Sequence, residues 1–323
     1  MKAILLWLFL SGLPGFMAAQ AQEFPTKPVR WIMPFLAGSV PDNSVRLLQE
    51  QISSTLGKPI VIDNRPGGAG VPAASEMLRS APDGHTLLGL DAGHYAILPA
   101  MRSDLPYNVL RDFVPVALIF STPQFVVVRD SLGVRDLREL IALIRSKPGA
   151  LQHGSNGTGS VNHLMFENFK APLGLEVLHV PYKGSVEFIP ALLRGDISMA
   201  MIGLTSVHSL VKSGQLKLLA SSGRTRFRLT SDIPTIAEAG GPPDFDLTAR
   251  FVVVTLSGTP APVIEKISTA VLKAQSIPEV AARALAAGYE LTPAGPQRLA
   301  EIMSDDIKAY RAAVRNAGIA ETR

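Results

Sequence analysis

The alternation of short apolar runs with helical patterns is the feature that most constrains the fold of this chain. Apolar runs at 29–34, 60–64 and 86–90 are separated by segments at 43–56 and 69–80 whose apolar residues recur with helical periodicity. Strands that alternate with helices in this way are typical of α/β proteins with mainly parallel sheets. The sequence therefore predicts an α/β fold that begins as a β-α-β-α-β series.

A second series of the same kind begins near Phe125. Its expected strands are 125–128, 177–180, 198–201 and 216–220, and its expected helices are 137–144, 161–173, 186–194 and 206–212. In the first of these helices, Asp136 and Glu139 have the spacing of a capping box. After Arg224 a proline-containing stretch leads to a strand at 251–255 and to helices at 261–274, 278–287 and 296–316. Such a tail can return to the first unit.

The start of the chain has the pattern of an export signal. Lys2 is followed by an apolar run from Ala3 to Phe16 and by Met17-Ala18-Ala19-Gln20-Ala21, which ends in a small-x-small pattern. We expect residues 1–21 to be a signal peptide that is cleaved near Ala21. The apolar run is too short to be a membrane anchor, for which about 20 residues are needed. The mature protein is expected to be soluble and periplasmic.

Composition excludes several classes of protein. The chain has no cysteine, so it can form no disulfide, thiolate metal site or lipid-modified cysteine. The formal net charge is only +4, aromatic residues make up 6%, and basic residues are interspersed with acidic ones. This pattern lacks the basic face expected of a nucleic-acid-binding protein, and we expect no nucleic-acid partner.

Three glycine-bearing loops share the same placement between a strand and a helix. They are residues 153–160, 64–70 and 182–185. Backbone N–H groups at the start of a helix can bind an anion without a charged side chain. The first loop matches neither the dinucleotide fingerprint nor the phosphate-binding P-loop. Each loop alone could be a tight turn with a helix cap, but three together favour a shared anion-binding cleft at the carboxyl ends of the strands.

Neither a metal site nor a catalytic site is predicted. The six histidines have no close metal-ligand spacing. They are His85, His94, His153, His163, His179 and His208. The chain has no Gly-x-Ser-x-Gly elbow, and no serine stands out as a nucleophile. We therefore expect no catalytic residue, no metal and no cofactor.

Several sequence blocks, in their order and spacing, resemble those of the Bug receptors, the substrate-binding components of tripartite tricarboxylate transporters. The resemblance covers nearly all of the mature chain. The blocks are Phe24–Arg30, Asp63–Gly68, Ala81–Leu88, Leu105–Tyr107, Ser155–His163, Val180–Ser185 and Ile233–Gly240.

This resemblance implies a two-lobed periplasmic binding fold with a two-segment hinge. Residues 22–123 and 224–323 would form one lobe, and residues 124–223 the other. The family binds small carboxylates between the lobes, largely through backbone N–H groups and ordered water. Closure of the lobes would present the loaded receptor, expected to be a monomer, to subunits of a membrane transporter.

The resemblance also implies a set of ligand-binding residues. In the first lobe these are Phe35, Gly38, Ser39, Asp42, Arg65, Gly67, Gly70, Asp91, Gly93 and His94. In the second lobe they are Ser155, Asn156, Thr158, Ser160, His163, Tyr182, Lys183 and Ser185. For Asp42 the alternative is a helix N-cap, for His163 and Arg65 a structural hydrogen bond, and for Lys183 a solvated side chain.

The chain departs from the family pattern at several of these places. Its first loop reads Leu36 to Asp42 with Pro41, which removes a backbone donor. Ile202 stands at a position that is acidic in the family, and Arg250 precedes the last core strand. A guanidinium can form paired hydrogen bonds with a carboxylate, so we expect Arg250 to select a second carboxylate on the solute. The alternative is that Arg250 faces solvent beside the hinge.

Two other functions fit the same fold. The loaded receptor could signal to a membrane sensor kinase instead of a transporter, since both would bind the closed form. An envelope hydrolase on this scaffold would need a nucleophile or an acid-base pair and would turn over its bound acid.

Overall fold

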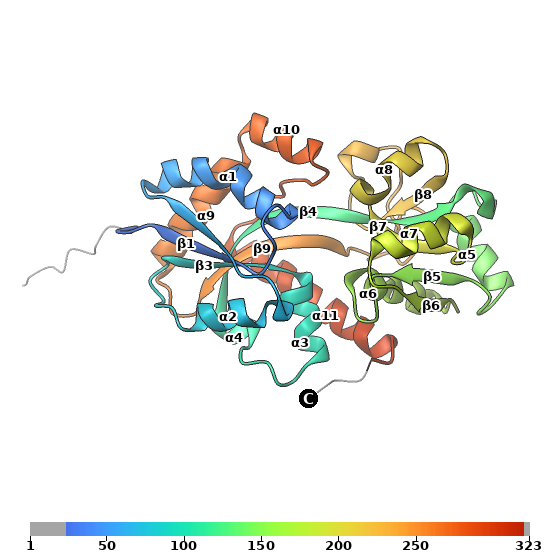
Figure 1. Ribbon diagram of the computed structural model, residues 1–323, viewed down its shortest axis with the longest axis horizontal. Coiled ribbons are helices and arrows are strands. Elements are labelled where there is room, and N and C mark those ends of the chain that lie inside the picture. Colours follow the sequence, from blue (N-terminus) through green and yellow to red (C-terminus); the bar gives the residue numbers. More distant parts are fainter. Residues whose placement is uncertain (1–23, 320–323) are drawn as a thin grey trace, which may run out of the picture.

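The computed structural model describes residues 24–319 and shows two lobes joined by long strands (Figure 1). The predicted export signal at 1–21 lies outside the described residues. The first lobe contains a sheet in the order β2-β1-β3-β9-β4. Its strands are β1 (Val29–Met33), β2 (Ile60–Asn64), β3 (Thr86–Asp91), β9 (Thr248–Leu256) and the first part of β4 (Phe113–Arg129). β1 pairs with β2 and β3 in parallel, and β9 is antiparallel to β3 and β4.

The second lobe is built on the other end of β4. This end pairs with β7 and β8 in antiparallel fashion, and β5 pairs with β6 and β7 in parallel. The strands are β5 (Gln152–Ser155), β6 (Leu178–Pro181), β7 (Met199–Gly203) and β8 (Leu216–Ser221). The predicted α/β class and two-lobed fold are confirmed.

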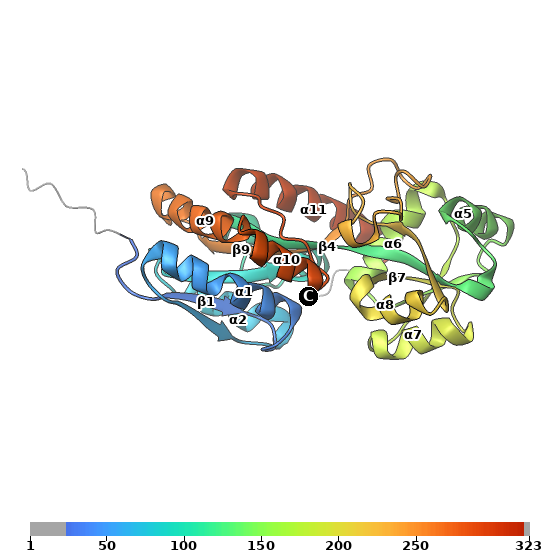
Figure 2. The same ribbon diagram turned by 90° about the horizontal axis from the view of Figure 1, so that it is seen from above.

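Helices cover both faces of each sheet (Figures 1 and 2). The first lobe has α1 (Val40–Leu56), α2 (Val71–Leu78), α3 (Leu98–Met101), α4 (Val109–Asp112), α9 (Ala261–Gln275), α10 (Pro278–Ala286) and α11 (Pro296–Asn316). The second has α5 (Leu137–Ser146), α6 (Val161–Lys170), α7 (Ser185–Arg194) and α8 (Leu204–Lys212). None of the helices formed by residues 24–319 is long and apolar enough to cross a membrane.

Local sequence explains where the helices begin. Asp136 caps α5 by accepting from the backbone N–H of Glu139 at 2.9 Å, as the capping-box spacing predicts. The N-cap of α1 is Ser39, so this helix starts three residues before the predicted position at 43. Pro41 is tolerated in the first turn because the N–H groups there have no partner within the helix. The alternative that Asp42 is the N-cap is therefore wrong.

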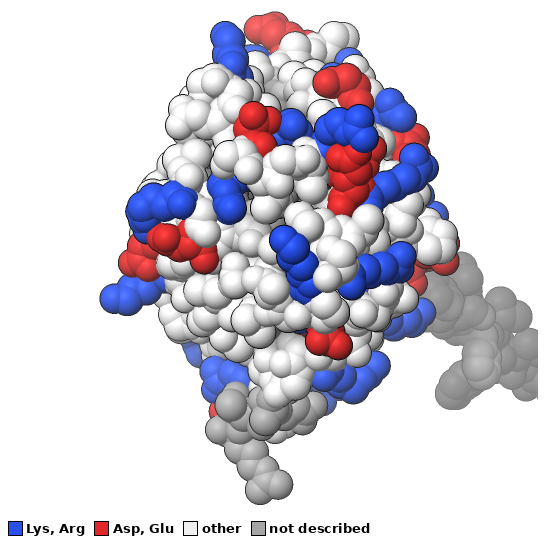
Figure 3. All heavy atoms as spheres, turned by 90° about the vertical axis from the view of Figure 1, so that its right-hand side faces the viewer, with Lys and Arg blue, Asp and Glu red and all other residues white. Residues whose placement is uncertain are grey.

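Surface charges of both signs are interspersed at the far end of the second lobe (Figure 3). Several ion pairs of this lobe are exposed, among them Arg194 with Asp196 at 2.7 Å and Lys217 with Asp130 at 3.0 Å. Exposed pairs of this kind contribute little to stability. The fold of this lobe therefore depends on its apolar interior.

β4 is the first connection between the lobes. Residues 113–123 pair with β9, and residues 125–129 pair with β7 and β8. The strand therefore changes lobes near Gln124. Only its second half was predicted from the sequence.

β9 is the second connection, and it lies later in the chain than predicted. The segment 224–247 remains hydrogen-bonded to the second lobe, because the N–H of Ile236 donates to Ser221 O (2.8 Å) and that of Leu247 to Ser222 O (3.2 Å). The predicted boundary between the lobes was at 223/224. By these hydrogen bonds, the chain returns to the first lobe only at the start of β9.

The last helix contacts both lobes. α11 packs along the first-lobe strand β4 and also against α6 of the second lobe. The Asn168 side-chain amide on α6 donates to Ala309 O on α11 at 3.2 Å. Tyr310 and Val314 of α11 belong to the same buried cluster as Phe166 and Phe169 of α6. Any movement between the lobes must therefore rearrange the contacts of α11.

Arg250 on β9 anchors α11 through a buried ion pair. Its Nη1 lies 2.5 Å from Asp306 Oδ1, and its Nη2 lies 3.0 Å from Asp246 Oδ1. The Tyr95 hydroxyl donates to the other oxygen of Asp306 at 2.5 Å. Only 8% of Arg250 is exposed, so the alternative that it faces solvent is wrong. Burial raises the pKa of the Asp306 carboxyl to about 6, although Arg250 and Tyr95 act in the opposite direction.

This network predicts a large stability loss for Asp306→Ala. Asp306→Ala leaves the buried Arg250 with Asp246 alone and the Tyr95 hydroxyl without its acceptor, so we expect a loss of about 3 kcal/mol in the free energy of unfolding, the lower end of the range for a broken buried ion pair. Urea unfolding measures it. The matched control is Asp305→Ala on the same helix, whose side chain is 74% exposed and which should change stability by less than about 0.5 kcal/mol. Equal losses in the two variants would contradict the assigned role.

Candidate functional site

A pocket of about 310 Å³ lies between the two lobes. Residues of both lobes and of the crossing strands form its wall. The polar and charged lining residues are Asp91, Thr122, Gln124, Asn156, Asn162, Ser185, Thr205, Ser206, Arg250 and Tyr289. The apolar and small ones are Val40, Pro41, Phe120, Val161, Ile202, Gly203, Ala249, Phe251, Ala287 and Gly288.

Four helices begin at this pocket. The first turns of α1, α6, α7 and α8 each contribute to its wall, through Pro41, Asn162, Ser185 and Ser206 respectively. The N–H groups of a first turn have no acceptor within their own helix. They also lie at the positive end of the helix dipole, which favours anions. The wall therefore offers several uncharged anion-binding groups from both lobes.

The helix starts differ in how their N–H groups are already used. Ser160 caps α6 by accepting from the His163 N–H at 3.4 Å. Helices α7 and α8 follow Gly184 and Gly203, and neither has a side-chain cap. The first-turn N–H groups of α7 and α8 are thus the ones best able to bind a solute.

Amide side chains at the pocket are held in fixed orientations. The Asn162 amide donates to Met201 O at 2.7 Å, and the Asn156 amide donates to Asn162 Oδ1 at 2.8 Å. The Asn162 amide also lies 3.5 Å from Gln124 Oε1. These bonds link the start of α6 to β7 and β4. They orient the polar wall before a solute arrives.

Two charged side chains line the pocket, and both already have partners. Asp91 Oδ1 lies 2.6 Å from His94 Nδ1. Burial acts to raise the pKa of the Asp91 carboxyl, but the neighbouring His94 outweighs it and the pKa is lowered. Arg250 is shared between Asp306 and Asp246. Attraction for an anion must therefore come mainly from the helix N–H groups.

A larger hollow of about 490 Å³ lies along α11 on the other side of Arg250. It is lined by four aspartates, Asp244, Asp246, Asp305 and Asp306, and by the three arginines Arg224, Arg250 and Arg298. The excess of carboxylates makes it less suitable for an anion than the interlobe pocket.

Four of the predicted ligand-binding residues line the interlobe pocket, namely Asp91, Asn156, Ser185 and Arg250. In the first loop, Asp42 is fully buried and accepts from the Gly38 N–H at 2.8 Å and from Arg46 Nε at 2.8 Å. Ser39 caps α1. Gly38, Ser39 and Asp42 therefore shape the loop in this structure.

Aromatic and arginine side chains near the other first-lobe loops also have partners in the protein. Phe35 packs edge-on against His94 and Phe251, with ring centroids 5.1 and 5.6 Å apart. Arg65 Nε donates to Asp63 at 2.9 Å, which is the structural hydrogen bond considered as its alternative. Gly93 begins a single π-helical turn, η2 (Gly93–Ile97), after β3.

Most of the predicted second-lobe residues lie around the loop between β5 and α6. Ser155 and His163 are buried beneath this loop, and Thr158 is exposed on it. Ser160 caps α6. In the next loop, Tyr182 is half-buried and packs against Phe188, with ring centroids 6.4 Å apart, while the exposed Lys183 donates through its N–H to Glu187.

Several polar residues of the pocket wall were not predicted from the sequence. Thr205 and Ser206 belong to a helix whose start was placed two residues too late, so its first turn was not recognised as an anion site. Thr122 and Gln124 belong to the part of β4 that was not predicted. Asn162 could have been predicted, because it lies in the first turn of the helix that Ser160 caps. Histidines 153, 163 and 179, distant in sequence, come together in the second lobe.

The fold and the interlobe pocket are those of a periplasmic solute-binding protein. The family model of the tripartite tricarboxylate transporter family receptor matches residues 44–319. The chain therefore belongs to this family, whose members are receptors and not enzymes and whose location is the periplasm.

Relatives and solved structures of this family resemble the chain over most of its length. Protein BugT of Bordetella pertussis is 30% identical, over 92% of this chain and 91% of its own. A Rhodopseudomonas palustris protein, Rpa4515 with adipate, is 31% identical with a TM-score of 0.73, over 92% of this chain and 99% of its own. MatC of the same organism, with bound malate, is 28% identical with a TM-score of 0.69, over 90% of this chain and 100% of its own.

Two glycines of the second predicted loop allow a direct test of why glycine is needed there. Gly70 has a φ of 77°, and an added Cβ would lie 2.2 Å from the His94 ring. Gly67 has a φ of 99° with open space around it. Gly67→Ala should cost about 1 to 3 kcal/mol, because φ 99° with ψ 172° is a conformation that few residues other than glycine adopt. Gly70→Ala should cost about 1 kcal/mol of left-handed strain and at least about 1 kcal/mol more for the steric clash with His94. Thermal unfolding measures both, and a loss of about 1 kcal/mol or less for Gly70→Ala would show that close packing on His94 is unimportant.

Proposed function

We propose that this receptor binds a small organic carboxylate in the interlobe pocket. The convergence of four helix N-termini on one pocket of about 310 Å³ is the observation that carries this proposal. Binding of adipate and malate by two structural relatives supports it. A carboxylate of this size would be held mainly by backbone N–H groups, since both charged side chains of the wall are already paired.

Solute binding is coupled to closure of the two lobes. Helix α1 belongs to the first lobe and helices α6, α7 and α8 to the second, so a solute that contacts both sets favours the closed arrangement. The extent of closure is limited by the difference in affinity between the closed and open forms. In this proposal the first lobe consists of residues 22–123 and of the chain from the start of β9 onward. The segment between these two parts forms the second lobe.

The closed receptor then delivers its solute to the subunits of a membrane transporter. A membrane sensor kinase is the alternative partner, because it would recognise the same closed form. The protein acts as a monomer after its export signal is removed near Ala21.

Thermal unfolding of the mature chain with mono-, di- and tricarboxylates tests the proposed function. A ligand at about 100 times its dissociation constant adds roughly 2.7 kcal/mol to the free energy of unfolding. We expect a rise of several degrees in Tm for one class of acid. The absence of a shift with every acid at millimolar concentration would overturn the proposal.

Ser206→Asp places a negative charge in the first turn of α8, at the pocket wall. We expect affinity for adipate or malate to fall by at least about tenfold because the carboxylates repel each other. Stability should not fall, since an acidic residue near a helix N-terminus is favourable. Isothermal titration calorimetry measures the affinity. Ser209→Asp, exposed on the same helix away from the pocket, is the matched control, and equal losses in both would contradict the assigned site.

Arg250 selects a second carboxylate on the solute in this proposal. It lines the pocket while two of its nitrogens contact Asp306 and Asp246, so its remaining N–H groups are the ones that a solute would use. Arg250→Lys keeps the charge and loses the planar fork. We expect affinity for adipate to fall by about tenfold and affinity for a monocarboxylate of equal length to change little, as measured by calorimetry. An unchanged ratio of the two affinities would exclude this role.

A further inference from the structure

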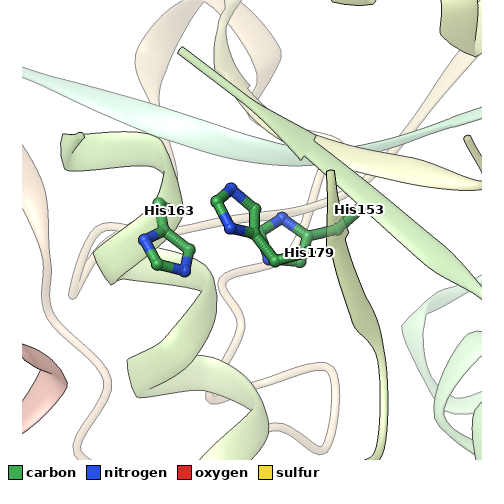
Figure 4. Close-up of side chains that lie close together, drawn as sticks. All are labelled: His153, His163 and His179. Atoms are coloured by element: carbon green, nitrogen blue, oxygen red, sulfur yellow. The ribbon is translucent and has the colours of Figure 1, made fainter. Parts of the chain in front are cut away.

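Three histidines, of which His153 and His163 are buried and His179 is half-buried, form a cluster beneath the loop that joins β5 to α6. Figure 4 shows His163 on α6 and, beside it, His153 from β5 and His179 from β6. The rings of His163 and His179 are stacked, with centroids 3.7 Å apart and planes 12° apart. His153 stacks on His179 at 4.8 Å and on Phe166 at 4.0 Å. His153 is fully buried, and neither of its ring nitrogens has a hydrogen-bond partner.

Two of these histidines hold the loop in place. The backbone N–H of Gly159 donates to His163 Nδ1 at 3.1 Å. His179 Nε2 lies 2.7 Å from the Ser155 hydroxyl, which in turn donates to Gly157 O at 3.0 Å and accepts from the Gly157 N–H at 3.1 Å. The histidines thus contact both ends of the loop whose Asn156 lines the interlobe pocket.

The hydrogen bond to Gly159 requires an unprotonated Nδ1 on His163. A backbone N–H can only donate, so Nδ1 must offer its lone pair, and the ring is neutral with its proton on Nε2. This nitrogen lies 3.5 Å from Glu167 Oε1. Protonation of His163 would turn Nδ1 into a donor and break the bond to the loop.

The ring geometry does not suit a shared metal ion. One ring nitrogen of each histidine lies within 4.8 Å of the others. Around a tetrahedral zinc ion, nitrogens at about 2.0–2.1 Å from the metal would be about 3.4 Å apart. An imidazole binds a metal along a lone pair in its own plane, but these planes are 12–25° apart, so the lone pairs run side by side instead of converging. The stacked arrangement is that of packed neutral rings.

The surroundings favour the neutral forms of His153 and His179. Burial lowers the pKa of His153 well below its usual value, and the neighbouring His179 and His163 lower it further. Burial, assisted by His163, lowers the pKa of His179 to about 4. The charged side chains facing the cluster are Glu167 and Lys170 of α6, which pair at 2.9 Å. On the neighbouring strand β7, the apolar Met199 lies opposite His153.

We propose that His163 and His179 are positioning residues, which hold the 155–160 loop in its solute-binding shape through their hydrogen bonds to Gly159 and Ser155. This inference rests on the proposed function, because it assumes that the loop borders the solute pocket.

Amide substitutions separate the hydrogen bonds from the rings. An asparagine side chain can place its amide near the position of Nδ1 of a histidine, and a glutamine near that of Nε2. His163→Asn and His179→Gln should therefore retain the loop contacts, and His163→Leu and His179→Leu should lose them. His208→Leu, on the exposed face of α8, is the control for the change in residue type.

The first measurement is amide hydrogen exchange of Gly159 at pH 7 without solute. Protection should persist in His163→Asn and fall at least about tenfold in His163→Leu. Calorimetry with adipate and malate should show affinities near that of the wild type for both amide variants and a loss of about fivefold to tenfold for both leucine variants, the effect of one lost hydrogen bond.

The pH dependence of the free energy of unfolding distinguishes the His179 ring from a side chain that only forms the same hydrogen bond. A histidine of normal pKa, about 6.5, takes up a proton in the unfolded chain before His179 does in the folded one. The folded state is therefore favoured above pH 6.5 and loses stability as pH falls from about 6.5 toward 4. Each such histidine raises the unfolding constant up to about tenfold per pH unit. His179→Gln should flatten this profile between pH 6.5 and 5 while keeping solute affinity.

The outcomes separate this inference from the proposed function. If the wild type binds neither adipate nor malate but the exchange pattern of Gly159 holds, the solute assignment fails and the positioning role stands. Equal exchange in His163→Asn and His163→Leu would overturn the positioning role. Stabilisation of the wild type by Zn²⁺ alone, abolished in His179→Gln, would also overturn it and identify a metal site instead.

Discussion

The antiparallel pairing of β4 with β9 is the constraint on which the two-lobed structure depends. Both strands pass from one lobe to the other, and Arg250 on β9 is held by Asp306 of α11 and by Asp246. This buried contact fixes the last helix against the crossing strands, and α11 in turn packs on α6 of the second lobe. The pocket lies where these crossings bring the helix starts of the two lobes together. Its shape is therefore set by the hinge.

In the proposed function, the pocket binds a charged solute without presenting a free charge of its own. Asp91 is paired with His94, and Arg250 with two carboxylates, so neither dominates the wall. The N–H groups at the starts of α7 and α8, which have no side-chain cap, are the anion-binding donors in this proposal. Such donors are fixed in direction by the helices behind them, so binding requires little rearrangement of the wall. His163 and His179 bond to the 155–160 loop and so hold the segment that leads into α6.

The sequence predicted the fold well because its main features are periodic. Leu137, Leu140, Ile141 and Ile144 recur on one helical face and are buried in α5 as expected. The first half of β4 was missed. The return crossing was placed too early because the prolines after Arg224 interrupt the pattern, although the backbone there stays bonded to β8.

The candidate site was harder to predict because its residues meet only in space. Asp91, Asn156 and Ser185 could be placed on loops that follow strands, and they line the pocket. By contrast, Asp42 and Arg65 are already paired with Arg46 and Asp63, which are close to them in sequence and were not considered as competitors for the solute. The grouping of His153, His163 and His179 depends on the pairing of β5 with β6 and on the packing of α6, which sequence spacing does not reveal.

Titration of the ¹⁵N-labelled mature chain with adipate or malate, followed by NMR, tests the central claim most directly. If the helix N-termini bind the carboxylate, the backbone N–H signals of Ser185, Thr205 and Ser206 will show the largest shifts. Largest shifts at Asp244 to Asp246, beside the hollow along α11, would contradict the account and move the binding site to the other side of the hinge.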